Sequence, residues 1–152
     1  MQLRANMDGP IIWWQTRRRR NELRGGSYAF RKNILTANTL AVSHHYAIQY
    51  EYEIAYLCMP NGRKVVIGDF YGDPQAAVIA ADETWCAIGG CGLIVYRIAE
   101  PFEEYVPGKS AGQYLEFHRS APDVWWVTEM KQSGAFALEL RMDGGAIRTV
   151  SF

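Results

Sequence analysis

The sequence predicts a mainly β (α+β) fold: a twisted antiparallel sheet or two packed sheets built from hairpins and a meander, with one or two short helices. Four short apolar runs follow one another between Lys64 and Ile98, each bounded by Gly, Pro or Asp. Before them, from Tyr46 to Met59, apolar and polar residues alternate with the period of a strand. The turns are short, which favours antiparallel neighbours, because parallel strands need crossovers of about a dozen residues.

Size and composition predict one domain spanning residues 1–152, with 1–26 as a candidate peripheral N-terminal segment. The chain has 152 residues, which is long enough to bury a sizeable core. Hydrophobic residues make up 49% and charged residues 21%, a balance that excludes a wholly disordered chain.

The N-terminal segment has two open interpretations. Pro10 and the pair Gly25-Gly26 could begin and end a helix, whereas Ile11–Trp14 would also suit a short strand. Ser27–Asn33 alternates in the manner of an edge strand. We expect the N-terminal segment to lie across the sheet.

Tyr46–Met59 predicts one long strand, because every even position is Tyr, Ile or Cys. A strand of this length would contain a bend or a bulge. Pro60-Asn61-Gly62 then predicts a hairpin turn into Lys64–Gly68, the first of the four apolar runs. These runs predict consecutive strands of one meander. They are Lys64–Gly68, Ala76–Ala81, Thr84–Ile88 and Leu93–Ile98.

The glycines of Gly89–Gly92 predict a tight hairpin with positive φ, not a phosphate cradle, since no helix follows them. Ala99–Gly108 reads as a loop, Ala111–His118 as one or two helical turns, and Val124–Val127 as a strand. The chain would close with a hairpin of two strands around Asp143-Gly144-Gly145. Those strands are Ala135–Met142 and Ala146–Phe152.

No catalytic, cofactor-binding or metal-binding motif occurs in the sequence, so we expect no enzyme and no cofactor. A nucleophilic Cys86 or Cys91 would need a nearby histidine as base, and sequence alone cannot provide that pairing. The histidines are His44, His45 and His118. Three cysteines without ligand spacing indicate a reducing compartment, and no apolar run is long enough for a membrane helix. We therefore expect a cytoplasmic protein with no membrane contact.

Charge is divided unevenly along a chain whose net charge is zero. Residues 1–64 hold 10 Lys+Arg against 4 Asp+Glu, and residues 65–152 hold 6 against 12. The run Arg17–Arg20 could contact phosphates, but no groove-binding motif accompanies it, so nucleic acid is not the favoured partner. The two halves could instead pair with each other inside the fold.

Two Trp-Trp pairs and several acidic turns indicate a protein-binding surface. Neighbours in a strand face opposite ways, so Trp125 and Trp126 cannot both enter one core. Aromatic anchors beside acidic loops are typical of interaction hot spots, although cover by the chain itself would also account for them. The candidate contact residues are Asp69, Asp73, Asp82, Glu83, Glu100, Glu103, Glu104, Trp125 and Trp126.

The stretch GDPQAAVIAADETWCAIGGCGLIVYRI resembles immunity proteins of bacterial polymorphic-toxin and contact-dependent growth inhibition systems. The shared pattern is an apolar strand, the acidic turn Asp82-Glu83, the strand start Trp85-Cys86, then Gly-Gly-x-Gly and a further strand. It covers about a fifth of the chain. The resemblance implies a cytoplasmic protein that binds a cognate toxin domain, such as a nuclease, and blocks its active site.

The alternative is a small β-rich enzyme or ligand-binding domain, with a cavity between sheets lined by Tyr50, Tyr52, Trp85 and a histidine. The oligomeric state, the strand order and the identity of any toxin remain open at this level.

Overall fold

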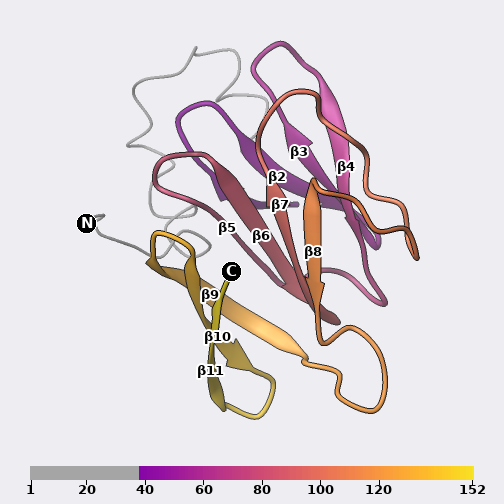
Figure 1. The fold of residues 1–152 in the computed structure, drawn as a ribbon, viewed down its shortest axis with the longest axis vertical. Helices are drawn as coiled ribbons and strands as arrows, with labels where there is room; N and C mark the ends of the chain where they lie inside the picture. Colours follow the sequence, from indigo (N-terminus) through magenta and orange to yellow (C-terminus); the bar gives the residue numbers. More distant parts are fainter. Residues whose placement is uncertain (1–37) are drawn as a thin grey trace.

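The computed structural model describes residues 38–152, which form an all-β domain (Figure 1). The predictions for Pro10–Gly26, for Arg17–Arg20 and for Ser27–Asn33 lie outside the described residues. Within residues 38–152 there are eleven strands and no helix. The strands are β1 (Thr39–Val42), β2 (Ala47–Glu51), β3 (Ile54–Cys58), β4 (Lys64–Asp69), β5 (Ala76–Ile79), β6 (Trp85–Gly90), β7 (Gly92–Arg97), β8 (Tyr114–Phe117), β9 (Val127–Gly134), β10 (Ala137–Met142) and β11 (Ile147–Ser151).

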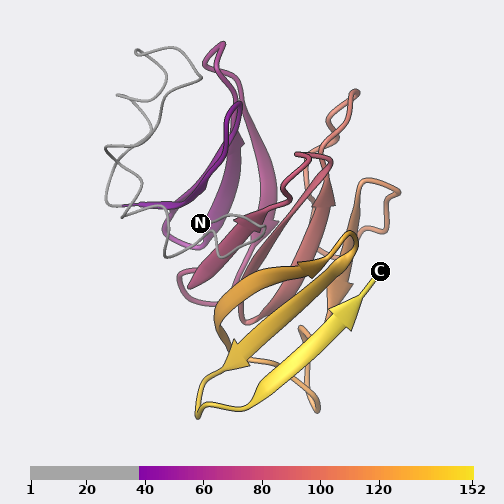
Figure 2. The ribbon, with the colours of Figure 1, turned by 90° about the vertical axis from the view of Figure 1, so that its left-hand side faces the viewer.

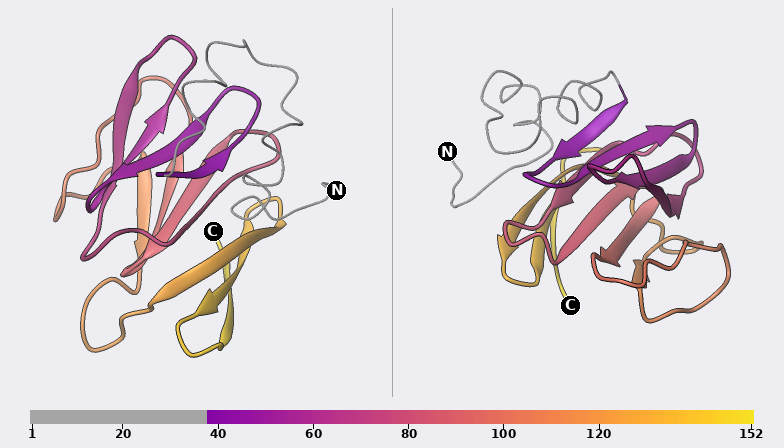
Figure 3. Two further views of the ribbon diagram at one scale, coloured as in Figure 1. Left: turned by 180° about the vertical axis from the view of Figure 1, so that it is seen from behind. Right: turned by 90° about the horizontal axis from the view of Figure 1, so that it is seen from above.

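The strands form three antiparallel sheets, which confirms the predicted mainly β class. Their orders are β1-β2-β3-β4, β5-β6-β7-β8 and β11-β10-β9. Every neighbouring pair runs antiparallel. Figure 3 shows the same three sheets from behind and from above.

The sheet β5–β8 is the middle layer of the domain (Figure 2). One face packs against β1–β4, where Ile48 and Leu57 meet Ile88 and Ile94 in a single cluster. The other face packs against β9–β11 around Trp85. Because both faces are covered, all residues of β5 and β6 are buried. This explains why the central runs are continuously apolar and do not alternate.

The predicted long strand Tyr46–Met59 is wrong, because the chain folds back at Tyr52-Glu53 into the hairpin β2–β3. Tyr52 adopts a φ of 56°, and Glu51 pairs with Ile54 across the two-residue turn. A two-residue turn changes which alternate positions face the core. Ile48 is buried in β2, whereas Leu57, at an odd position, is buried in β3.

The predicted meander is confirmed from β5 to β7, but β4 belongs to the other sheet. β4 pairs with β3, and the buried ring of Phe70 anchors the connection that leads to β5. The predicted helix over Ala111–His118 is also wrong, since β8 occupies this stretch. Tyr114 pairs with Tyr96 of β7, so pairing at the sheet edge prevails over the local helical pattern.

The C-terminal hairpin is confirmed, and the strand predicted at Val124–Val127 begins at its last residue. β9 starts at Val127, while Trp126 forms an isolated bridge to Cys91. The turn that joins β6 and β7 does need a glycine. Gly92 has a φ of 84°, and a Cβ there would lie 2.8 Å from the Cα of Arg119.

Candidate functional site

The predicted contact residues do not form one patch, because they lie at opposite ends of the middle sheet. β5 begins after Asp73 and ends before Asp82, and its start lies beside the β6–β7 turn. Asp69, Asp73 and Trp126 lie at this turn end. Asp82 and Glu83 lie at the other end, where the chain also leaves β7. Glu100, Glu103 and Glu104 follow β7 in the loop of residues 99–110.

At the far end, the carboxylates already have partners within the domain. Glu83 accepts hydrogen bonds from the Ser43 hydroxyl and from the backbone N–H of His45, and it lies 2.7 Å from His45 Nδ1. The Asp82 carboxylate accepts hydrogen bonds from Thr84. The Glu83 contacts join turns of two different sheets, and the Asp82 contacts stabilise its own turn, so both acidic groups stabilise the fold.

The three glutamates of the following loop are also engaged. Glu100 lies 3.1 Å from Arg63, and Glu103 lies 3.2 Å from Lys109. Glu104 accepts a hydrogen bond from the backbone N–H of Val66, which fastens the loop to β4. Glu100 and Glu103 therefore face cations, and Glu104 accepts a hydrogen bond that fixes its position.

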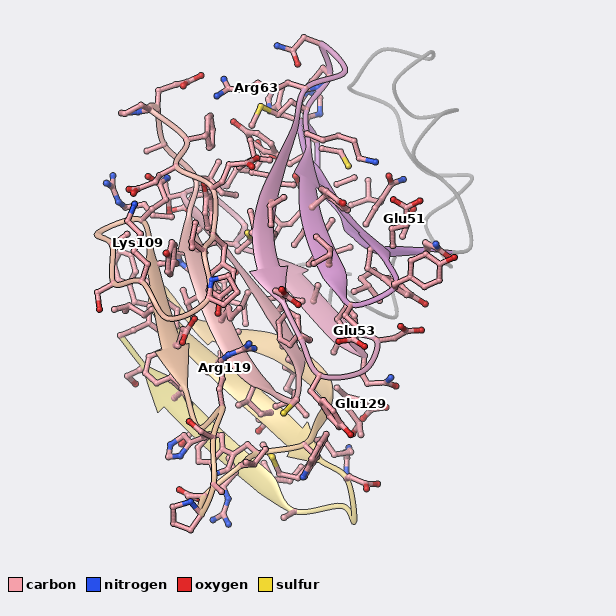
Figure 4. All side chains as sticks on the ribbon, turned by 90° about the vertical axis from the view of Figure 1, so that its right-hand side faces the viewer. Glu51, Glu53, Arg63, Lys109, Arg119 and Glu129 are labelled. Atoms are coloured by element: carbon pink, nitrogen blue, oxygen red, sulfur yellow. The ribbon has the colours of Figure 1, made fainter. Side chains whose placement is uncertain are left out.

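The carboxylates at the end of the domain beside the β6–β7 turn differ from those above. They are not engaged within the part of the chain that the structure describes. No hydrogen bond or ion pair from a described residue reaches these side chains, which come from several turns at this end of the domain. Glu51 and Glu53 flank the β2–β3 turn, Asp69 ends β4, Asp73 lies in the β4–β5 loop, and Asp143 begins the β10–β11 turn. Figure 4 shows Glu51 and Glu53 together on one side of the molecule.

Three exposed aromatic rings stand among these carboxylates. Tyr52 is 82% exposed, Tyr71 78% and Trp126 48%. The rings of Tyr71 and Trp126 lie 6.5 Å apart between centroids, with an angle of 67° between their planes. We call this surface the acidic aromatic end. It comprises Tyr52, Tyr71 and Trp126 with Glu51, Glu53, Asp69, Asp73 and Asp143.

Backbone hydrogen bonds hold the turns of the acidic aromatic end together. The N–H of Phe70 donates to the carbonyl of Glu53 at 2.9 Å, which joins the β4–β5 loop to the β2–β3 turn. The N–H of Asp143 donates to the carbonyl of Trp126 at 2.7 Å. Large rings on a backbone fixed in this way contribute contact area at a low cost in conformational entropy.

Arg119 joins two turns of the acidic aromatic end through its largely buried side chain. Its side chain, 17% exposed, donates to the carbonyl of Asp69 at 2.5 Å and to that of Cys91 at 3.2 Å. The guanidinium also lies over the ring of Phe70, 4.6 Å from its centroid. One side chain therefore joins the end of β4 to the β6–β7 turn.

The two tryptophans of the pair 125–126 face different surroundings, as the strand argument requires. Trp125 is half-buried and stacks on His118, with centroids 3.8 Å apart. Arg148 lies over the same indole at 5.8 Å. Trp125 is thus covered by the chain itself, and only Trp126 of the pair belongs to the acidic aromatic end.

The structure brings no cysteine and histidine together as a catalytic pair within residues 38–152. Burial raises the pKa of the Cys86 thiol above its ordinary value, which disfavours the nucleophilic thiolate. Cys91 lies against the carbonyl of Arg119. His45 and His118 each contact a carboxylate, Glu83 and Asp123, at the surface. In this part of the chain, no three His, Cys, Asp or Glu side chains are placed to hold a metal.

The residues of the predicted cavity do not come together. Tyr52 lies in the exposed turn of the first sheet. Trp85 is buried on the opposite face of the middle sheet, where its indole N–H donates to the carbonyl of Ala135.

Sequence reasoning missed Tyr52 and Tyr71 as members of the site, and also Glu51, Glu53 and Asp143. The signal for the first two was an aromatic residue next to acidic ones in a turn, in Glu51-Tyr52-Glu53 and Asp69-Phe70-Tyr71. Interpreting the first triplet as the middle of a long strand concealed it. Asp143 had no such signal, because its neighbour Trp126 is brought near only by the fold.

Comparisons with known proteins identify no relative of this chain. No family model matches the chain, and no match was found among curated proteins or solved structures. Among the described residues there is no helix that could cross a membrane.

Proposed function

We propose that this protein is an immunity protein that binds a cognate toxin domain and blocks its active site through the acidic aromatic end. The observation that carries the proposal is the gathering of unengaged carboxylates around exposed aromatic rings at one end of a rigid sheet. Such a surface needs no catalytic group, since inhibition requires only complementary shape and charge. The sequence resemblance supports the same function.

The charge of the domain favours a basic partner. Residues 38–152 contain 8 Lys+Arg and 14 Asp+Glu, which gives a net charge of −6. Most of the basic side chains there are held in ion pairs, such as Arg63 with Glu100 and Arg141 with Glu129. The remaining field would steer association with a positively charged surface.

A nuclease is the toxin class that best suits this surface. A nuclease binds the phosphate backbone through Lys and Arg side chains, so the cleft around its active site is basic. An acidic surface could occupy that cleft in place of the nucleic acid. Tyr and Trp rings would supply the anchors that such interfaces need. A nuclease acting on cellular nucleic acid would be opposed in the cytoplasm, which is where we place the protein.

Co-expression with the toxin domain encoded beside this gene tests the proposal. The unmodified chain should restore growth and elute with the toxin from a gel-filtration column. The triple variant Tyr52→Ser, Tyr71→Ser, Trp126→Ser should do neither, while Phe136→Ser, which alters an exposed ring at the far end, should behave as the unmodified chain. Absence of both rescue and complex for the unmodified chain would refute the function. Full rescue by the triple variant would refute the assignment of the surface.

A further inference from the structure

We infer that Tyr71 and Trp126 form the subsite for one arginine side chain of the bound protein. The inference rests on the proposed function and deepens it, because it names the group that the partner must insert. We call the two rings the aromatic corner.

The geometry of the aromatic corner suits a planar cation. The two ring planes meet at 67° with centroids 6.5 Å apart, and both side chains keep about half or more of their surface in solvent. A guanidinium attracted to an aromatic ring lies within about 6 Å of its centroid. A single cation could therefore contact both rings at once.

The cations that the structure describes lie over other aromatic rings. Arg148 lies over Trp125, and Arg119 lies between Phe70 and Tyr105. Lys64 covers Tyr56, and Arg63 covers Phe102. No Lys or Arg among residues 38–152 lies over Tyr71 or Trp126. Residues 38–152 thus use this contact repeatedly, whereas the exposed rings of Tyr71 and Trp126 have no described cation over them.

Carboxylates adjoin the aromatic corner and favour arginine over lysine. Asp73 follows Tyr71 by two residues, and Asp143 is hydrogen-bonded through its backbone to Trp126. A guanidinium can stack on a ring and at the same time donate a fork of hydrogen bonds to a carboxylate in its plane. An ammonium is more strongly hydrated and has no planar face to stack.

A peptide titration of the full-length chain tests the inference without any toxin. The probes are acetyl-Gly-Arg-Gly-amide, the lysine peptide of the same length and the citrulline peptide, which keeps the shape of arginine without its charge. The readout is the NMR signal of the Trp126 indole N–H, identified by its loss in Trp126→Leu. We expect a saturable shift with the arginine peptide, a weaker one with lysine and none with citrulline. Equal shifts with the arginine and citrulline peptides would overturn the inference.

Variants separate this inference from the proposed function. Tyr71→Leu should weaken binding of the arginine peptide between roughly twofold and thirtyfold, the range of one cation–π contact. Phe136→Leu, at the far end, should leave it unchanged. If the arginine peptide binds but no toxin is neutralised, the subsite stands and the proposed function fails. If the toxin is bound equally well by the unmodified chain, Tyr71→Leu and Trp126→Leu, the function stands and the subsite is refuted.

Discussion

The guanidinium of Arg119 lies over the ring of Phe70, with 4.6 Å between its Cζ and the ring centroid. Phe70 is buried at the point where the chain leaves the first sheet for the second. Arg119 comes from the segment after β8, on the opposite edge of the middle sheet. This contact therefore joins two parts of the chain at the acidic aromatic end, and the hydrogen bond from Arg119 to the carbonyl of Cys91 adds a third.

Replacing Arg119 by Met should lower the free energy of unfolding by about 2 kcal/mol, because two backbone carbonyls lose a charged donor. Urea denaturation followed by tryptophan fluorescence would measure the change. Arg97→Met is the matched control, since this exposed arginine has no side-chain partner among the described residues. Equal stability of both variants would show that Arg119 does not hold the β4–β5 loop.

Much of the fold could be predicted where the signal is local. The turn residues Asp143-Gly144-Gly145 and the glycine at position 92 mark their hairpins in the sequence, and the structure confirms both. The alternation of Phe136, Leu138, Leu140 and Met142 predicts a buried face. The last three residues are buried, whereas Phe136, in the turn before β10, is 56% exposed. In these places the backbone conformation and the burial pattern depend on adjacent residues alone.

The rest depends on contacts between residues far apart in the sequence. The turn Pro60-Asn61-Gly62 marks the β3–β4 hairpin locally, and the structure confirms it, but nothing local shows that β5 begins a second sheet and does not pair with β4. The β2–β3 turn was concealed because it has no glycine and because Tyr52 takes the positive φ itself. The apolar odd positions Ala55 and Leu57 were the overlooked sign. Of the site, Asp69, Asp73 and Trp126 were predicted, whereas their assembly with Tyr52 and Tyr71 needed the fold.

At Glu83, two variants should separate the effect of the backbone conformation on stability from that of the side chain. Glu83 has a φ of 60°, and its carboxylate accepts hydrogen bonds from Ser43 and His45. Glu83→Ala loses the hydrogen bonds and keeps the unfavourable backbone conformation. Glu83→Gly loses the same bonds but tolerates that conformation. We expect both variants to be less stable than the unmodified chain. The free energy of unfolding of the alanine variant should be about 1 kcal/mol lower than that of the glycine variant. Thermal unfolding would rank the three proteins, and an alanine variant as stable as the glycine variant would contradict this account.

The domain should lose stability at alkaline pH through Tyr105. Burial, followed by its hydrogen bond to Glu116, raises the pKa of Tyr105 from 10.0 to about 12. The unfolded chain therefore releases this proton at lower pH than the folded chain. The contribution of Tyr105 to the free energy of unfolding is complete below pH 10 and declines as the pH rises toward about 12. Urea midpoints measured from pH 8 upward should fall less steeply for Tyr105→Phe than for the unmodified chain. Tyr71→Phe, at an exposed ring, is the matched control. If the urea midpoint falls equally steeply with pH for Tyr105→Phe and the unmodified chain, ionisation of Tyr105 is not the cause of the loss of stability.

Charge at the two ends of the domain should affect toxin binding differently. Glu53 and Asp73 are unengaged at the acidic aromatic end, whereas Glu103 is paired with Lys109 in the loop after β7. The double variant Glu53→Gln, Asp73→Asn should lower the association rate constant with a basic toxin domain by roughly tenfold at low salt, because steering depends on the unopposed field. The dissociation rate should change much less, and the difference in association should shrink as salt is added. Surface plasmon resonance at two salt concentrations would measure both rates. Glu103→Gln should leave the association rate nearly unchanged, and a loss equal to that of the double variant would mean that the toxin does not approach the acidic aromatic end.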